Sequence, residues 1–182
     1  DMMDRNANTL NRMVLMLYDS SELGLSEELR SHRQEQVLCN DVAHESISFM
    51  QQFFPKMKIQ FETTLSDSFF IRSNRLYLMR SLREILYNSA KYSDGKNIRL
   101  QLTADDNNVR FTFSDTGPGI PAHYYALMFS PFTKMNELTE GLGLGLPLAK
   151  RHITNLGGTM TLDTSYHEGC RFIIELPIRQ KA

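Results

Sequence analysis

The chain has 182 residues, of which 41% are hydrophobic, and a formal net charge of −1 at pH 7. This length allows one full domain with an appendage, and the balanced charge argues against a general electrostatic affinity for nucleic acid or for an anionic membrane. No apolar run is long enough to span a bilayer, and no signal-peptide pattern is recognisable.

Residues 1–23 are predicted to form one helix. Apolar residues recur there at alternating four- and three-residue steps, the pattern of a bundle or coiled-coil seam: Met3, Ala7, Leu10, Val14 and Leu17. Two interpretations remain open, because such a helix either lies on its own domain or pairs with another copy in a dimeric bundle. Gly24 ends the helix, and the polar residues 24–34 indicate a connector.

The next part of the chain favours short elements. Three short strands are predicted, at residues 35–39, 58–64 and 69–72. Asn40 or Asp41 is placed to cap a helix that ends at Pro55. A turn is expected at Ser66–Asp67, between the second and the third strand.

A longer helix is predicted over residues 75–92, with Ser73 or Asn74 as its cap. Its apolar side chains fall on one face: Leu78, Met79, Leu82, Ile85, Leu86 and Ala90. Its polar side chains fall on the other: Arg80, Ser81, Glu84, Asn88, Lys91 and Tyr92. The simplest interpretation of this split is a helix with one buried face and one solvated face.

Residues 97–104 and 109–114 alternate apolar and polar side chains. This alternation predicts a β-hairpin with its turn at Asp105–Asn108. Pro121 is placed to start a short helix toward Met128.

The C-terminal part begins with a stretch without clean periodicity, residues 129–142. A loop of that length between regular elements is more often functional than not. A helix over residues 143–156, stopped by Gly157–Gly158, is followed by two antiparallel strands at residues 159–164 and 170–177. The predicted strands form hairpins, and the predicted helices cluster on one face. Together they predict an α/β two-layer sandwich whose mixed sheet is mainly antiparallel.

Two glycine clusters flank that loop. Asp115-Thr116-Gly117-Pro118-Gly119-Ile120 precedes it, and Gly141-Leu142-Gly143-Leu144-Gly145-Leu146 follows it. Glycine lets main-chain N–H groups approach a ligand closely, and such a loop running into a helix N-terminus is a ready anion site. Asp115, at a strand end, is well placed to accept a hydrogen bond from a buried amino group. One such cluster usually only makes a turn, whereas two in this order are more specific.

The chain resembles the GHKL ATP-binding family, whose domain has the Bergerat fold, because four of that family's landmarks occur in order. The N box matches Glu84-Ile85-Leu86-Tyr87-Asn88-Ser89-Ala90-Lys91-Tyr92, and the F box matches Phe132. The two glycine clusters match the D-x-G-x-G and G-x-G-x-G boxes. Within that family the chain looks like the catalytic domain of sensor histidine kinases, and the resemblance covers most of its length.

The resemblance implies ATP and Mg²⁺ as cofactors and gives the matching residues their roles. Asp115 is expected to read the adenine amino group. Asn88, with Glu84, is expected to be catalytic by holding Mg²⁺, a cation that favours oxygen ligands and bridges phosphates. The other expected nucleotide contacts are Lys91, Tyr92, Gly117, Gly119, Ile120, the lid residues Phe132 and Lys134, and Gly141, Leu142, Gly143, Leu144, Gly145 and Leu146.

As a histidine kinase, the protein is expected to transfer the γ-phosphoryl group of ATP to a histidine outside this chain. From there the group passes to an aspartate of a response-regulator receiver domain. Residues 1–30 would be part of a dimerisation helix with its connector, giving a homodimer, and residues 31–182 the catalytic domain. The fragment is expected to be a cytoplasmic domain without nucleic-acid or membrane contact, in a bacterial protein anchored in the inner membrane.

No histidine of the chain has a convincing phosphoacceptor context. His44-Glu45 resembles the family's His-Glu start, but the usual basic residue and the Pro five positions on are missing. The others are expected on the surface or in loops, without metal-ligand spacing: His32, His123, His152 and His167. Cys39 and Cys170 also lack that spacing, which favours two buried thiols in a reducing compartment.

One departure from the family pattern keeps two alternatives open. Many histidine kinases carry Asn at the position of Glu84, whereas hydrolytic GHKL members such as gyrase use a Glu there as the general base on water. The chain is therefore alternatively a GHKL-type ATPase with Glu84 as base. A third interpretation is a module that binds nucleotide without turnover.

Overall fold

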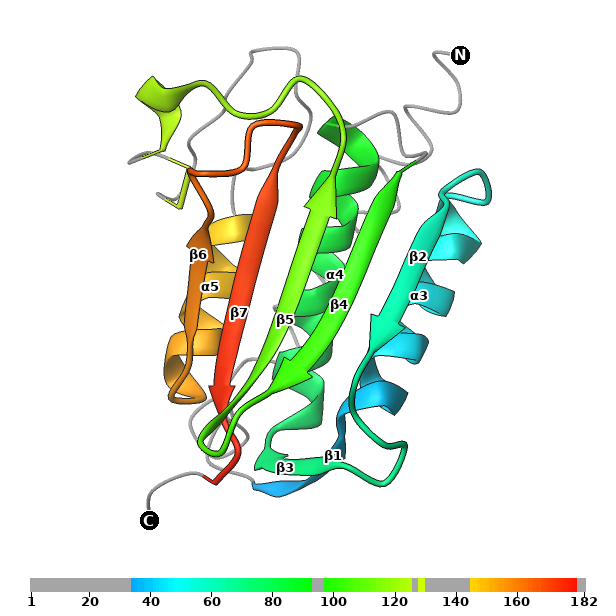
Figure 1. The fold of residues 1–182 in the computed structure, drawn as a ribbon, viewed down its shortest axis with the longest axis vertical. Helices are drawn as coiled ribbons and strands as arrows, with labels where there is room; N and C mark the ends of the chain where they lie inside the picture. Colours follow the sequence, from blue (N-terminus) through cyan, green and yellow to red (C-terminus); the bar gives the residue numbers. More distant parts are fainter. Residues whose placement is uncertain (1–33, 93–96, 126–127, 130–144, 180–182) are drawn as a thin grey trace, which may run out of the picture.

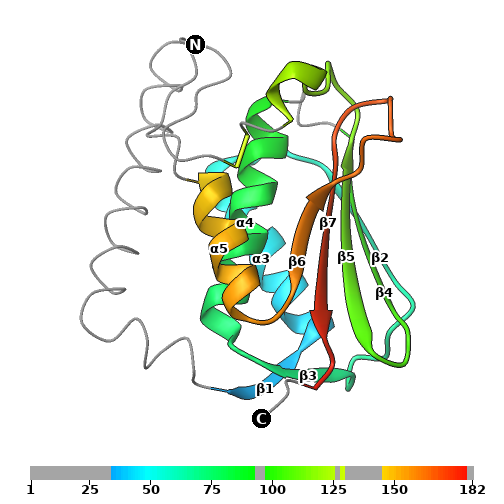
Figure 2. The same cartoon turned by 90° about the vertical axis from the view of Figure 1, so that its left-hand side faces the viewer.

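The computed structural model of the chain describes residues 34–92, 97–125, 128–129 and 145–179, with only the backbone of Tyr92. The predicted helix at residues 1–23 lies outside these ranges. A sheet carries the described helices on one of its faces, so the molecule has two layers (Figures 1 and 2). The helices are α3 (Cys39–Phe53), α4 (Arg75–Tyr92) and α5 (Gly145–Asn155). None of the helices in these ranges combines the length and the apolar character needed to cross a bilayer.

The main sheet has five strands in the order β2-β4-β5-β7-β6. β2 pairs with β4 in parallel, and every other pairing in this sheet is antiparallel. The strand bounds in this order are β2 (Ile59–Thr63), β4 (Ile98–Ala104), β5 (Asn108–Asp115), β7 (Arg171–Pro177) and β6 (Thr159–Leu162). The predicted α/β two-layer sandwich with a mainly antiparallel sheet is confirmed.

Two further short strands, β1 (Glu35–Leu38) and β3 (Phe70–Ser73), form a separate two-stranded sheet. The short strands predicted around Ser66–Asp67 therefore exist, but they pair with different partners. β2 joins the main sheet in a register that sets Phe61 opposite Leu100, so apolar side chains continue along the sheet.

The N-termini of α3 and α4 differ in their capping, since only α4 has a side-chain cap. Asn74 caps α4 as predicted, because its Oδ1 accepts from the Tyr77 amide at 3.1 Å. The predicted cap of α3 is wrong, because that helix begins before Asn40 and no side chain caps it. Asn40 instead donates to the Leu65 carbonyl at 3.0 Å and accepts from the Thr63 hydroxyl at 2.8 Å, which ties α3 to β2.

The end of α5 follows the glycine signal, whereas the helix predicted after Pro121 is shorter than expected. Gly157 has φ +83°, a conformation that favours glycine, and the Gly158 amide donates to the Ile153 carbonyl at 2.9 Å. Pro121 precedes only a short 3₁₀ turn, η1 (Ala122–Tyr124), rather than a longer helix.

The packing of α5 against α4 buries polar residues that were expected in solvent. Arg80 is only 4% exposed, and Ser81 is fully buried. The Ser81 hydroxyl donates to the Ala149 carbonyl across the interface at 3.3 Å. His152 is 2% exposed, with its ring centroid 4.6 Å from that of Tyr77, so the surface position expected for it is wrong. Helical periodicity gives two faces, but it does not reveal that a second helix covers the polar one.

The environment of His152 disfavours its charged form. Burial, with added repulsion from Arg80 and Arg151, lowers its pKa from 6.5 to about 4. Neither ring nitrogen has a hydrogen-bond partner among the described residues. His152 therefore behaves as a neutral core residue at neutral pH.

Replacing His152 by Leu should remove an acid sensitivity of the fold. Because the folded pKa lies below the unfolded one, stability is fully present above about pH 6.5 and falls as the pH drops toward 4. The parent should lose about 2 kcal/mol more of its unfolding free energy than His152→Leu between pH 7 and pH 5. Urea unfolding at the two pH values measures this, with the exposed His44→Leu as control. Equal losses in the parent and in His152→Leu would contradict it.

The two cysteines are free and buried, as predicted. Burial raises the pKa of each thiol to about 12, and the negative charge of Asp115 adds to the effect at Cys170. Both thiols therefore remain protonated at neutral pH and act as small core side chains.

Candidate functional site

Three of the elements that carry predicted site residues end or begin at the same edge of the molecule. α4 and β5 both run toward this edge, and α5 starts there (Figures 1 and 2). The C-terminal half of α4, with Glu84 and Asn88, therefore lies at the same edge as Asp115, the last residue of β5. Gly145, the first residue of α5, completes the set.

Asp115 is a buried carboxylate on the helix-facing side of the sheet. Side chains alternate along a strand, so Asp115 shares the face of the buried Phe113, and its partner in register is the buried Ile98. Its side chain is held by the Cys170 amide, which donates to Oδ1 at 3.0 Å. The Asp115 amide in turn donates to the Cys170 carbonyl at 2.9 Å. Asp115 is 6% exposed, so its carboxylate has a fixed place at the end of β5.

The turn after Asp115 is tightly packed against the β6–β7 connection. The Gly117 amide donates to the Glu168 carbonyl at 3.2 Å, and Gly119 has φ +72°, a conformation that favours glycine. A Cβ on Gly169 would lie 2.2 Å from the Asp115 carbonyl oxygen, so only glycine fits there. Sequence reasoning missed Gly169, although its place just before the last strand was a signal.

Glu84 and Asn88 lie one helical turn apart on the same face of α4, and both side chains carry oxygen atoms. The Asn88 amide nitrogen donates to the Glu84 carbonyl at 2.9 Å, which leaves the amide oxygen as the group for a ligand. Lys91 follows on the same helix, with its ammonium 5.8 Å from the Tyr87 ring centroid.

These oxygen donors fit a hard cation such as Mg²⁺. Among the described residues no group of three or more His, Cys, Asp or Glu side chains could hold a metal ion. The Glu84–Asn88 pair would therefore supply part of a coordination sphere, and phosphate oxygens and water would supply the rest. This is the usual arrangement for Mg²⁺ bound with a nucleotide.

The first turn of α5 and the turn after β5 complete the described part of the site. Gly145 and Leu146 are buried at the start of α5, where the first main-chain N–H groups of a helix have no intrahelical partner. Such a terminus favours anions. Ile120 is partly buried and packs against the core.

Several predicted contacts lie outside the described residues: Phe132, Lys134, Gly141, Leu142, Gly143, Leu144 and the side chain of Tyr92. They stay predictions. Of the histidines, His44 is exposed on α3 with its ring against Phe61, and His123 and His167 are exposed.

Comparison with known proteins places these elements in a family. The family model for histidine kinase-, DNA gyrase B- and HSP90-like ATPases matches residues 73–180. The alginate biosynthesis sensor protein KinB of Pseudomonas aeruginosa is 27% identical over 174 residues, which is 93% of this chain and 29% of KinB. The sensor histidine kinase YxdK of Bacillus subtilis is 29% identical over 159 residues, 85% of this chain and 48% of YxdK. The chain thus spans less than half the length of either relative.

Among solved structures, the mycobacterial sensor histidine kinase MprB aligns with a TM-score of 0.71 and 24% identity. The alignment covers 82% of this chain and 100% of the MprB chain. The two chains therefore share their fold.

Proposed function

Because the chain belongs to the family of histidine kinase-, DNA gyrase B- and HSP90-like ATPases, we propose that it is the ATP-binding catalytic part of a sensor histidine kinase. It transfers the γ-phosphoryl group of Mg-ATP to a histidine and onward to an aspartate of a response regulator. The observation that supports this most is the buried Asp115, held by Cys170 at the end of β5 beside a glycine turn.

Asp115 selects the base in this proposal. Its carboxylate accepts a hydrogen bond from the exocyclic amino group of adenine, while Gly117, Gly119 and Ile120 form the wall of the base pocket. Guanine has a carbonyl oxygen at the corresponding position, which a carboxylate repels. The site is therefore specific for adenine nucleotides.

Asn88 and Glu84 would hold Mg²⁺, and Lys91 adds a positive charge near them. When bound, the ion would supply charge neutralisation for the phosphates. The main-chain N–H groups at Gly145, at the start of α5, bind the phosphates with the lid residues that precede them. Catalysis in this domain consists of positioning and charge neutralisation, since the acceptor histidine is the nucleophile.

In this proposal the acceptor histidine lies outside this chain, and the response regulator is a separate partner. Residues 1–30 form part of a dimerisation helix and its connector, and residues 31–182 form the catalytic domain. The whole protein is a bacterial homodimer anchored in the inner membrane, with this domain in the cytoplasm. The bacterial sensor proteins to which the chain is related support the bacterial and sensor part of this proposal.

The kinase and ATPase interpretations differ in what Glu84 does. If it serves the metal, the chain binds Mg-ATP yet releases phosphate slowly. Release is therefore expected well below about one per second, near the low end of common enzyme rates, and Glu84→Gln should change it little. A phosphate-release assay on the 182-residue chain and on this variant measures the difference.

The control for this assay is Glu175→Gln, because Glu175 pairs with Arg110 at the opposite end of β5. Turnover of about one per second or faster that disappears only in Glu84→Gln would reject the kinase. Glu84 would then be a general base acting on water.

A further inference from the structure

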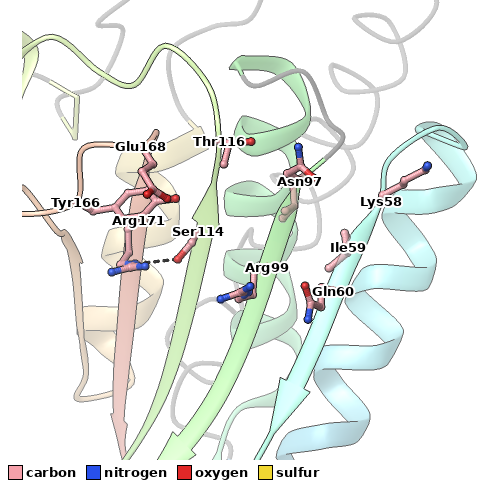
Figure 3. Close-up of a pocket in the computed structure, with 11 residues that line it drawn as sticks. Lys58, Ile59, Gln60, Asn97, Arg99, Ser114, Thr116, Tyr166, Glu168 and Arg171 are labelled. Carbon is pink, nitrogen blue, oxygen red and sulfur yellow. Dashed lines mark hydrogen bonds between the residues drawn. The ribbon is translucent and has the colours of Figure 1, made fainter.

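The face of the main sheet that carries no helices has a hollow of about 480 Å³. It lies close to the edge of the molecule that is proposed to bind the nucleotide. Side chains from four neighbouring strands line it in one row: Gln60, Arg99, Ser114 and Arg171. Tyr166 lies beside Arg171 at one side of the hollow, on the β6–β7 connection (Figure 3). Nothing in the proposed chemistry uses this tyrosine.

Tyr166 forms a hydrogen bond with Asp115, the residue whose carboxylate is proposed to bind the adenine base. Its hydroxyl donates to the main-chain carbonyl of Asp115 at 2.8 Å, a contact between residues 51 apart in the sequence. Burial, together with the charge of Glu168, raises the pKa of Tyr166. The hydroxyl therefore remains a donor at neutral pH.

The ring of Tyr166 is held by neighbours that are themselves fixed. The Arg171 guanidinium lies over it at 4.1 Å from the centroid, and the Arg171 Nε donates to the Ser114 hydroxyl at 2.8 Å. Arg171 also pairs with Asp163 at 3.7 Å. The Tyr166 amide donates to the Asp163 carbonyl at 3.3 Å. Both ends of the tyrosine are thus set before any ligand binds.

Three hydrogen bonds therefore set the position of Asp115 from the same connection. Cys170 holds its carboxylate and its amide, and Tyr166 holds its main-chain carbonyl. The carbonyl that Tyr166 holds is the first group of the turn through Thr116 and Gly117, so its position also sets where this turn starts. A shift of a few tenths of an ångström at this peptide moves the carboxylate relative to the base.

We propose that Tyr166 is a positioning residue for base recognition: its hydroxyl fixes the Asp115 peptide and thereby sets both the affinity for adenine nucleotides and the discrimination against guanine. The inference rests on the proposed role of Asp115. It assigns part of the specificity of the site to a residue on the opposite face of the sheet.

Tyr166→Phe tests this, because it removes the hydroxyl and keeps the ring under Arg171. Calorimetry of the 182-residue chain with Mg-ADP should show affinity about three- to ten-fold lower than in the parent, as expected for one neutral hydrogen bond. The ratio of Mg-ADP to Mg-GDP affinity should fall as well. Tyr124→Phe, on η1, is the matched control and should stay within about two-fold of the parent.

A double-mutant cycle with Asp115→Asn separates positioning from general stability. If Tyr166 acts through Asp115, Tyr166→Phe should change Mg-ADP affinity less than about two-fold in the Asp115→Asn background. The Mg-ADP affinities of the parent, the two single variants and the double variant are compared at a temperature at which all four are folded. Equal effects in both backgrounds, or parent-like affinity and base ratio in Tyr166→Phe, would overturn the inference. Failure of the parent itself to bind Mg-ADP would reject the proposed function instead.

Discussion

Asp115→Asn is expected to weaken Mg-ATP binding by about one to two orders of magnitude, because a buried hydrogen bond to a charged group contributes about 1.5–3 kcal/mol. The substitution is nearly isosteric. The Asn side-chain oxygen can still accept from the Cys170 amide, which donates to the carboxylate at 3.0 Å in the parent. The fold should therefore survive, and the loss should come from the missing acceptor for the adenine amino group.

Asp115→Ala should show the same loss of affinity together with a loss of stability. Without the side chain, the buried Cys170 amide has lost its partner, which costs about 1–3 kcal/mol. Calorimetry and thermal unfolding separate the two effects. Asp105→Asn, in the exposed β4–β5 turn, serves as the control. If Asp115→Asn bound ATP as tightly as the parent does, the assignment of Asp115 to the nucleotide site would be wrong.

Gly169→Ala should damage both the fold and the site. The added Cβ would lie 2.2 Å from the Asp115 carbonyl oxygen and 2.7 Å from its Oδ1, so the β6–β7 connection and the Asp115 turn must separate. Overpacking of this kind costs about 1–3 kcal/mol, which lowers the melting temperature of a domain of this size by about 2–10 °C. Because the displaced groups carry the base-reading carboxylate, Mg-ATP affinity should also fall at least about ten-fold.

Gly158→Ala is the matched control for this effect. Its Cβ would meet the Glu175 carbonyl oxygen at 2.3 Å, an equally severe clash, but at the turn between α5 and β6. Both variants should melt at lower temperatures, and at a temperature where both are folded only Gly169→Ala should bind Mg-ATP poorly. Parallel loss of affinity in both would mean that the effect is one of general stability.

The sequence predicted the local parts of this site because their signals are local. The alternation up to Asp115, the glycines after it and the polar face of α4 all lie within single elements, and the bounds of α4 were correct at residues 75–92. The glycine pair at residues 157–158 likewise identified the end of α5. The proposed roles of these residues came from a family resemblance rather than from periodicity.

The parts that the sequence did not predict depend on contacts between distant segments. Tyr166 and Gly169 contact Asp115 only because β7 returns beside β5. The place of Gly169 just before the last strand indicates a turn, but no local pattern links either residue to Asp115. Arg80 and His152 look like solvent-exposed polar residues on their own helices, and it is the contact between α4 and α5 that buries them. The missed cap of α3 has the same cause, because Asn40 bonds to Leu65 and Thr63 from a distant segment. The partners of the short strands are likewise set by the segments that lie beside them.

The central claim is that an adenine nucleotide binds at the edge shared by α4, β5 and α5, on the helix side of the sheet. Nuclear magnetic resonance of the ¹⁵N-labelled chain titrated with Mg-ADP measures it most directly. Amide signals of Glu84, Asn88, Asp115, Thr116, Gly117, Gly119 and Gly145 should shift in a saturable way, whereas those of Gln60 and Glu62 on β2 should not. Saturable shifts confined to β2 and to Arg99 and Arg171 on the face of the sheet that carries no helices, or none at all, would contradict it.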